Sequence, residues 1–200
     1  MMDLETAIRG RRSVRKFTSE KPDISILREL VEFATLAPNA MNKQDWHFTI
    51  ITSNAMREKI AATVKSKWEK LLNKGSGVDD MLVEYSGNFS IFLNAPALIV
   101  VDSRRPPAFL DHMLKDDTSR AIGAYASACM AVENMLLAAY DKGLGTCVYT
   151  GCLAAAIELA ELIGIPRQRE LVCLVAIGYP AETPPAPPRK SLDMVMTTIE

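Results

Sequence analysis

The chain has 200 residues, and its 23 Lys and Arg nearly balance its 24 Asp and Glu, for a formal net charge of −1. Hydrophobic residues make up 48% and charged residues 24%, proportions that exclude collagen-like, coiled-coil and wholly disordered chains. The charge balance argues against a general surface for nucleic acids or anionic membranes. The sequence also lacks the apolar run of a membrane span and the pattern of a signal peptide, so we expect a cytoplasmic protein.

The first half of the sequence alternates helical and extended patterns. Asp3 is the expected N-cap of a short helix that ends at Gly10, and an extended run follows over residues 11–17. Apolar spacing then predicts a helix over 24–36 capped by Asp23, a strand over 47–51, a helix over 56–72 and a buried strand over 97–101. The segment 73–90 has poor periodicity and is expected to be mobile or to form a lid.

The strongest helical pattern lies over residues 118–142, after an expected surface loop over 103–117. Its wide apolar stripe and many alanines predict a central core helix. The pattern next predicts two central strands separated by a helix, over 146–149, 154–163 and 171–177. A proline-rich tail makes residues 180–200 an extended arm, with a final strand-like run over 192–199. No second domain boundary is visible, so residues 1–200 are expected to form one α+β domain.

Cysteines and histidines limit the chemistry that side chains can supply. The four cysteines lie in apolar sequence without C-x-x-C spacing, so buried thiols are favoured over a zinc site or a redox dithiol. Two histidines are too few for most histidine-rich metal sites, and no G-x-S-x-G, P-loop or H-E-x-x-H motif occurs. We therefore expect no metal, and we assign the chemistry to a bound cofactor.

Basic residues are concentrated near the start of the chain, where residues 9–16 hold five cations. In an extended segment, alternate residues share a face, which places Arg11, Ser13 and Arg15 together. Two guanidinium groups and a hydroxyl can bind the oxygens of one phosphate through charge-assisted hydrogen bonds. The segment is thus either a phosphate clamp or a solvated basic run.

A second candidate site is the segment P-N-A-M-N-K-Q-D-W-H-F over residues 38–48, where short amides follow a proline. Asn39, Asn42 and Gln44 offer the paired donors and acceptors that suit a ribityl-like chain or a planar heterocycle. The alternative is an ordinary turn built by asparagines.

The third candidate is G-L-G-T-C-V-Y-T-G over residues 143–151, which does not match the G-x-G-x-x-G motif. Glycine allows a ligand to approach the backbone closely, so the amides near Thr150 and Gly151 are candidate donors. The alternative is a plain turn between helix and strand. Arg189 and Lys190 add two cations after the prolines, and the four sites together suit a phosphorylated, planar cofactor such as flavin mononucleotide (FMN).

Three segments in this order resemble the FMN-dependent nitroreductase family over nearly the whole chain. They are the early R-R-S-x-R, the A-P-N-A-M-N-K-Q-D-W-H-F segment over 37–48 and the G-L-G-T-C-V-Y-T-G segment. The resemblance implies a nitroreductase-like fold with a central, mainly antiparallel sheet flanked by helices. It also implies an intertwined, obligate homodimer with FMN at its interface.

The resemblance further implies roles for individual residues. The early R-R-S-x-R motif and a C-terminal cation would hold the phosphate, and the loop over residues 38–42 would reach across from the partner. An amide side chain before the strand at residue 97 would contact the pyrimidine edge of the flavin. Two backbone N–H groups would lie near flavin N5 and O4. The residues expected to bind FMN are Arg11, Arg12, Ser13, Arg15, Pro38, Asn39, Ala40, Asn42, Asn88, Thr150, Gly151 and Arg189.

This sequence departs from the family pattern at three places. Asn39 and Ala40 replace the usual serine pair, Asp45 replaces a proline, and Val148 replaces a common tryptophan. The flavin contacts should survive, because a backbone group or a different amide can serve, so the changes bear on the substrate face. Within the early motif, an extended strand points Arg12 away from Arg11.

The expected function is a homodimeric flavoprotein in which NADH or NADPH reduces FMN, and an electron-poor acceptor such as a nitroaromatic or a quinone is then reduced in a ping-pong cycle. Two alternatives remain open. One is a specialised relative, such as a dehydrogenase, a dehalogenase or a flavin-consuming enzyme. The other is a non-enzymatic flavin-binding or redox-sensing protein.

Overall fold

The computed structural model describes residues 2–73, 91–105 and 122–200. Its centre is a four-stranded sheet in the order β1-β2-β4-β3, in which every neighbouring pair is antiparallel. The strands are β1 (Trp46–Ile51), β2 (Ala97–Arg104), β3 (Gly145–Tyr149) and β4 (Arg169–Gly178). The predicted α+β fold with a central antiparallel sheet is confirmed.

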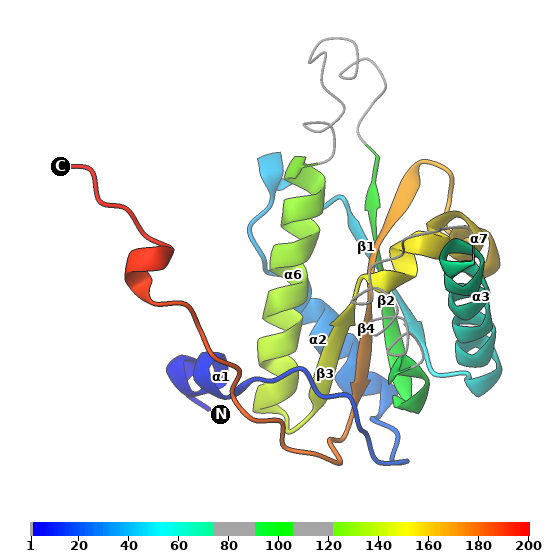
Figure 1. The fold of residues 1–200 in the computed structure, drawn as a ribbon, viewed down its shortest axis with the longest axis horizontal. Helices are drawn as coiled ribbons and strands as arrows, with labels where there is room; N and C mark the ends of the chain where they lie inside the picture. Colours follow the sequence, from blue (N-terminus) through cyan, green and yellow to red (C-terminus); the bar gives the residue numbers. More distant parts are fainter. Residues whose placement is uncertain (1, 74–90, 106–121) are drawn as a thin grey trace, which may run out of the picture.

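Helices cover both faces of the sheet (Figure 1). The α-helices of the described residues are α1 (Leu4–Gly10), α2 (Ile24–Thr35), α3 (Asn54–Leu72), α6 (Ile122–Asp141) and α7 (Ala156–Ile163). Short 3₁₀ turns occupy Ala40–Asn42, Ile91–Asn94, Gly151–Ala155 and Leu192–Met194. The α2 and α6 helices pack on one face, and α3 and α7 pack on the other.

The central strand β2 shows why two core layers form. Ile99 and Val101 face the layer of α2 and α6, whereas Leu98 and Val100 face the layer of α3 and α7. Successive side chains of a strand point to opposite faces, so the apolar run that begins at Ala97 must be covered on both sides. All five side chains are essentially unexposed.

Local capping explains several helix bounds. The Asp3 carboxylate accepts from the Thr6 N–H at 2.9 Å, which confirms the predicted cap of α1. Asp23 is the N-cap of α2, but its side chain makes no capping hydrogen bond. The α3 helix begins two residues before its predicted start because the Ser53 hydroxyl accepts from the Met56 N–H at 3.4 Å.

The α6 helix is the core helix that the sequence predicts. Ala128, Ala131, Met135 and Ala139 are completely buried, and the helix packs against α2 and the sheet. Small side chains allow helix axes to approach closely, which is the role that its alanines serve.

Three predicted elements differ in the structure. The β2 strand continues through Ser103 and Arg104, the start of the expected loop over 103–117, because β1 and β4 pair with it on both sides there. The β3 strand lies at an edge of the sheet rather than centrally. The run 192–199 forms a 3₁₀ turn and exposed extended backbone instead of a strand, since no described strand lies beside it. Of the expected lid over 73–90, Asn73 ends α3 and the rest lies outside the described residues.

The cysteines follow the prediction only in part. Cys152 and Cys173 are buried; burial raises the pKa of the Cys152 thiol to about 12 and raises that of Cys173 as well, so both stay protonated at neutral pH. Cys147 is half-buried, but Cys129 is exposed on the outer face of α6 and corrects the expectation of four buried thiols. Within the described residues, no group of three or more His, Cys, Asp or Glu could hold a metal ion. No helix in that part of the chain is long and apolar enough to cross a membrane.

Candidate functional site

The predicted phosphate clamp is an extended segment held against the edge of the sheet. Ser13 forms a parallel bridge with Thr146 of β3, and the Val14 N–H donates to the Thr146 carbonyl at 2.9 Å. Val14 is buried and Phe17 forms a second bridge with Pro180 at the root of the C-terminal arm. Because Val14 points inward, its neighbours Ser13 and Arg15 lie on the other face of the segment, as the alternation predicts.

Gly145 allows this segment to approach the sheet. A Cβ atom at Gly145 would lie 2.8 Å from the Val14 Cβ, closer than real Cβ atoms approach. Replacing Gly145 with alanine is therefore expected to displace residues 13–15 and to lower the free energy of unfolding by about 1 to 3 kcal/mol. Thermal unfolding checks this.

The matched control is Gly123→Ala, whose Cβ would meet its nearest neighbour, the Ala40 Cβ, at an ordinary 3.8 Å. Alanine is the better helix former, so that variant is expected to be as stable as the wild type or more stable by up to about 1 kcal/mol. If Gly145→Ala and Gly123→Ala unfold at the same temperature, Val14 can move without lowering the free energy of unfolding.

The three arginines of the clamp differ in what they contact. Arg15 is exposed, and its guanidinium donates only to the Ser13 carbonyl, at 3.3 Å, among the described residues. Arg11 is partly buried with its Nε 3.3 Å from Glu133 Oε1, yet that Nε has no hydrogen-bond partner in the described part of the chain. Arg12 donates to the Arg9 and Arg11 carbonyls at 2.6 and 2.7 Å. Arg12 thus caps the C-terminus of α1, whereas Arg15 is available to an anion.

The amide loop turns sharply at the N-terminal end of α6. Met41, Asn42 and Gln44 have φ values of 56°, 53° and 50°, in the left-handed region that side chains other than glycine seldom adopt. The Asn39 Oδ1 accepts from the Gln44 N–H at 2.9 Å and closes the loop. The Ala40 N–H donates to the Ser127 hydroxyl of α6 at 3.3 Å.

In the turn that follows β3, the carbonyl groups already accept hydrogen bonds from other residues of the protein. The Cys152 thiol donates to the Tyr149 carbonyl at 3.2 Å, and the Leu153 N–H donates to the Thr150 carbonyl at 2.9 Å. The Trp68 indole N–H of α3 donates to the Gly151 carbonyl at 2.9 Å. Outside the regular ladders, the Thr150 and Gly151 N–H groups have no acceptor among the described residues. Both remain candidate donors to a ligand.

One chain does not bring the clamp and the amide loop together. The clamp side lies near the C-terminal part of α6, where Gly10 contacts Tyr140 and Arg11 approaches Glu133. The loop contacts Gly123 and Ser127 near the other end of the same helix. At 1.5 Å of rise per residue, the two sites are therefore separated by about 10 to 25 Å along the axis of α6.

In the part of the chain that the structure describes, Arg189 makes no hydrogen bond or ion pair with the clamp. The C-terminal arm leaves the body of the protein, and the Arg189 guanidinium donates only to the neighbouring Pro187 and Pro188 carbonyls, both at 3.4 Å, among the described residues (Figure 1). Asn88 lies outside the described residues. The roles of both residues in FMN binding stay predictions.

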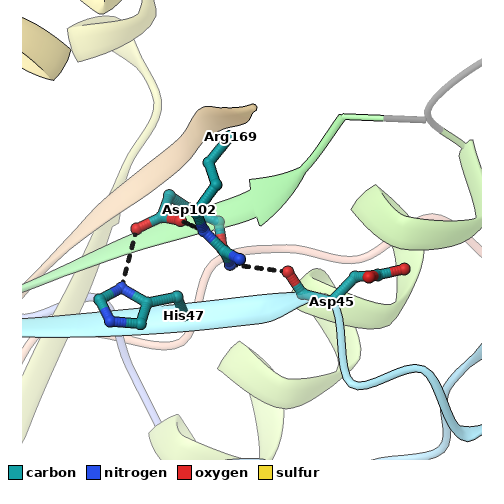
Figure 2. Close-up of polar contacts among 4 residues, drawn as sticks. All are labelled: Asp45, His47, Asp102 and Arg169. Carbon is teal, nitrogen blue, oxygen red and sulfur yellow. Dashed lines mark hydrogen bonds and ion pairs between the residues drawn. The ribbon is translucent and has the colours of Figure 1, made fainter. Parts of the chain in front are cut away.

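Sequence reasoning missed a polar cluster at the start of β1 (Figure 2). Asp102, only 1% exposed, accepts from the Arg169 Nε and lies 3.1 Å from the His47 Nδ1. The Arg169 Nη2 also donates to the Asp45 carbonyl at 2.7 Å. The cluster fixes the backbone where the amide loop enters the sheet. In the sequence, the one local sign of this cluster is that the charged Asp102 directly follows the apolar run over 97–101.

Comparison with known proteins agrees with this architecture. Residues 8–179 match the model of the Nitroreductase family. The chain belongs to the nitroreductase family. A 4-nitrobenzoate reductase of Nocardioides sp. is 26% identical over 212 residues, covering 88% of this chain and 79% of that protein. The predicted family is thereby confirmed.

Two solved structures extend the comparison from sequence to fold. Iodotyrosine deiodinase bound to FMN and 3-iodo-L-tyrosine is 27% identical, with a TM-score of 0.76 over 94% of this chain and 96% of that one. The match to a BluB-like flavoprotein from Clostridium difficile 630 covers 100% of both chains, with a TM-score of 0.86 at 24% identity. This member of the family therefore has the nitroreductase-like fold that its sequence predicts.

Proposed function

We propose that this nitroreductase-family protein is an FMN-dependent oxidoreductase. The observation that carries the proposal is the exposed Arg15 guanidinium, which has no carboxylate partner among the described residues and lies on the same face as Ser13. A phosphate monoester supplies the acceptor oxygens that this group lacks. When bound, FMN supplies the redox chemistry, accepting electrons from one substrate and passing them to another.

The residues present fit this cofactor at both of its ends. Arg11, whose buried Nε lies 3.3 Å from Glu133 Oε1 but has no hydrogen-bond partner among the described residues, would join Ser13 and Arg15 on the phosphate. The N–H groups of Thr150 and Gly151, which have no acceptor among the described residues outside the regular ladders, would donate to the N5 and O4 edge of the flavin ring. The side chains thus bind and orient the cofactor, and no side chain is required as a nucleophile.

We also propose a homodimer, because the clamp and the amide loop lie far apart in one chain. A two-fold axis lets each clamp receive Asn39 and Asn42 from the partner. Large apolar side chains that are exposed in the single chain support such an interface: Leu4, Ile8, Met41, Met130, Leu192, Met194, Val195, Met196 and Ile199. In this arrangement the arm carries Arg189 or Lys190 toward a phosphate.

The proposed reaction takes electrons from NADH or NADPH and passes them to an electron-poor acceptor, such as a nitroaromatic or a quinone, by a ping-pong mechanism in the cytoplasm. The likeness to a 4-nitrobenzoate reductase supports a nitroaromatic acceptor. The likeness to an iodotyrosine deiodinase supports a second candidate, the reductive removal of a halogen from an aromatic ring.

The visible absorption spectrum of the purified protein tests the proposal. The chromophore released on denaturation is expected to be FMN, and anaerobic NADH or NADPH is expected to bleach it. Adding 4-nitrobenzoate or 3-iodotyrosine to the reduced protein then separates the two acceptors, because only the substrate restores the oxidised spectrum. A protein that stays colourless after incubation with FMN overturns the cofactor assignment. Bound FMN that neither nucleotide bleaches overturns the assignment of the electron donor.

A further inference from the structure

The root of the C-terminal arm is paired with the phosphate clamp along several residues. The Thr18 N–H donates to the Tyr179 carbonyl and the Ala181 N–H donates to the Lys16 carbonyl, both at 2.9 Å. Together with the bridge between Phe17 and Pro180, these contacts make residues 15–18 and 179–182 neighbours. A displacement of residues 179–182 would therefore also displace the backbone of the clamp.

Glu182 adds a charged contact to this pairing. Its Oε1 accepts from the backbone N–H of Arg15 at 2.8 Å and from that of Lys16 at 3.1 Å. Its Oε2 lies 3.9 Å from the Lys16 Nζ, and the side chain is only 26% exposed. A carboxylate that accepts from two successive amides is a stronger anchor than a neutral acceptor. Glu182 thereby fixes the backbone of Arg15, the residue whose side chain remains available to an anion.

The same carboxylate lies in the electrostatic environment of the clamp. Burial raises the pKa of the half-buried Cys147 thiol on β3, while Arg15 lowers that pKa and Glu182 raises it. Both charges therefore act on one side chain of the neighbouring strand. A negative charge so placed opposes a phosphate, so its presence there needs a compensating benefit.

We propose that Glu182 is a positioning residue, which holds the Arg15 backbone extended so that its guanidinium faces the FMN phosphate and which couples the C-terminal arm to the clamp. The inference rests on the proposed FMN site. Glu182 then has two effects on FMN affinity, and they are of opposite sign. The hydrogen bonds to Arg15 and Lys16 favour FMN binding through geometry, and the negative charge disfavours it through repulsion.

Two substitutions separate these effects. Glu182→Gln keeps a side-chain oxygen that can accept from both N–H groups but removes the charge, whereas Glu182→Ala removes both. The FMN dissociation constant is measured at low salt by the quenching of FMN fluorescence. Glu182→Ala is expected to raise it about tenfold, and Glu182→Gln is expected to leave it unchanged or to lower it. Glu20→Ala, which removes an exposed acid shortly after the clamp, is expected to match the wild type.

The thermal midpoint of each apoprotein, followed in parallel, distinguishes positioning from general stability. A purely structural role lowers the midpoint of Glu182→Ala and leaves its FMN affinity at the wild-type value, which overturns the inference. Equal weakening in Glu182→Gln and Glu182→Ala also overturns it, because the acceptor geometry would then be irrelevant. If the wild type itself does not bind FMN, the proposed function fails instead. In an Arg15→Ala background, Glu182→Ala is expected to weaken binding little further.

Discussion

Replacing Arg15 with alanine is expected to weaken FMN binding by about 10- to 100-fold, the loss that one or two hydrogen bonds to a charged group produce. The guanidinium is exposed and its one described acceptor is the Ser13 carbonyl, so it can meet a phosphate without breaking an ion pair. Equilibrium titration of the apoprotein with FMN measures the change. The salt dependence of binding should also decrease, because one cation fewer neutralises the phosphate.

Arg9→Ala is the matched control for this prediction. Arg9 is also a cation of the N-terminal segment, but it pairs with Glu5 at 2.7 Å, and both side chains are more than 70% exposed. An exposed pair on a helix contributes little, so this variant is expected to bind FMN as the wild type does. If Arg15→Ala binds FMN as tightly as Arg9→Ala, the clamp is not the phosphate site.

Local sequence patterns predicted the interiors of the central strands β2 and β4 but not their ends. The apolar runs over 97–101 and 171–177 mark the interiors of β2 and β4, because strands covered on both faces read as continuous apolar runs. The strands continue to Arg104 and from Arg169, where the residues are charged or polar. Ser103 is predicted to begin a loop and Asp102 lies just beyond the predicted strand, yet both are buried because neighbouring strands flank them.

The candidate site shows the same division between local and tertiary information. Spacing identified Arg11, Ser13 and Arg15, but it could not tell which cations already have an acidic partner. Glu133, 3.3 Å from Arg11, and Glu182, 3.9 Å from Lys16, both come from distant parts of the chain. Alternation predicts that Arg12 lies away from this face, and its role as a cap, which depends on the end of α1, could not be predicted from spacing.

The cluster at the start of β1 joins residues that are 55 and 67 positions apart, so no local motif could contain it. It also explains why Asp45 is tolerated where the family pattern has a proline. The contacts from Arg169 and from the Arg104 N–H use only the Asp45 carbonyl, which any residue at this position supplies. The departure therefore leaves the entry of the amide loop into the sheet intact.

Replacing Asp102 with alanine is expected to lower the free energy of unfolding by about 3 kcal/mol, because it leaves the partly buried Arg169 guanidinium without its carboxylate. For a chain of this length the thermal midpoint should decrease by about 10 °C, which calorimetry measures. Asp102→Asn keeps the shape and one acceptor oxygen, so its loss should be smaller. Because Arg169 also holds the Asp45 carbonyl, the amide loop should lose protection from hydrogen exchange in the alanine variant.

The neighbouring pair of Glu170, on β4, and Arg105, the residue after β2, provides the control. Its charged atoms are 3.7 Å apart and its side chains are 59% and 35% exposed, compared with 1% for Asp102. Solvent screens such a pair, so Glu170→Ala should change stability by less than about 1 kcal/mol. Equal losses in Asp102→Ala and Glu170→Ala would mean that burial does not strengthen the Asp102 contacts. A much larger loss of stability in Asp102→Ala than in Glu170→Ala would mean that Asp102 and Arg169 hold the start of β1, where the amide loop enters the sheet.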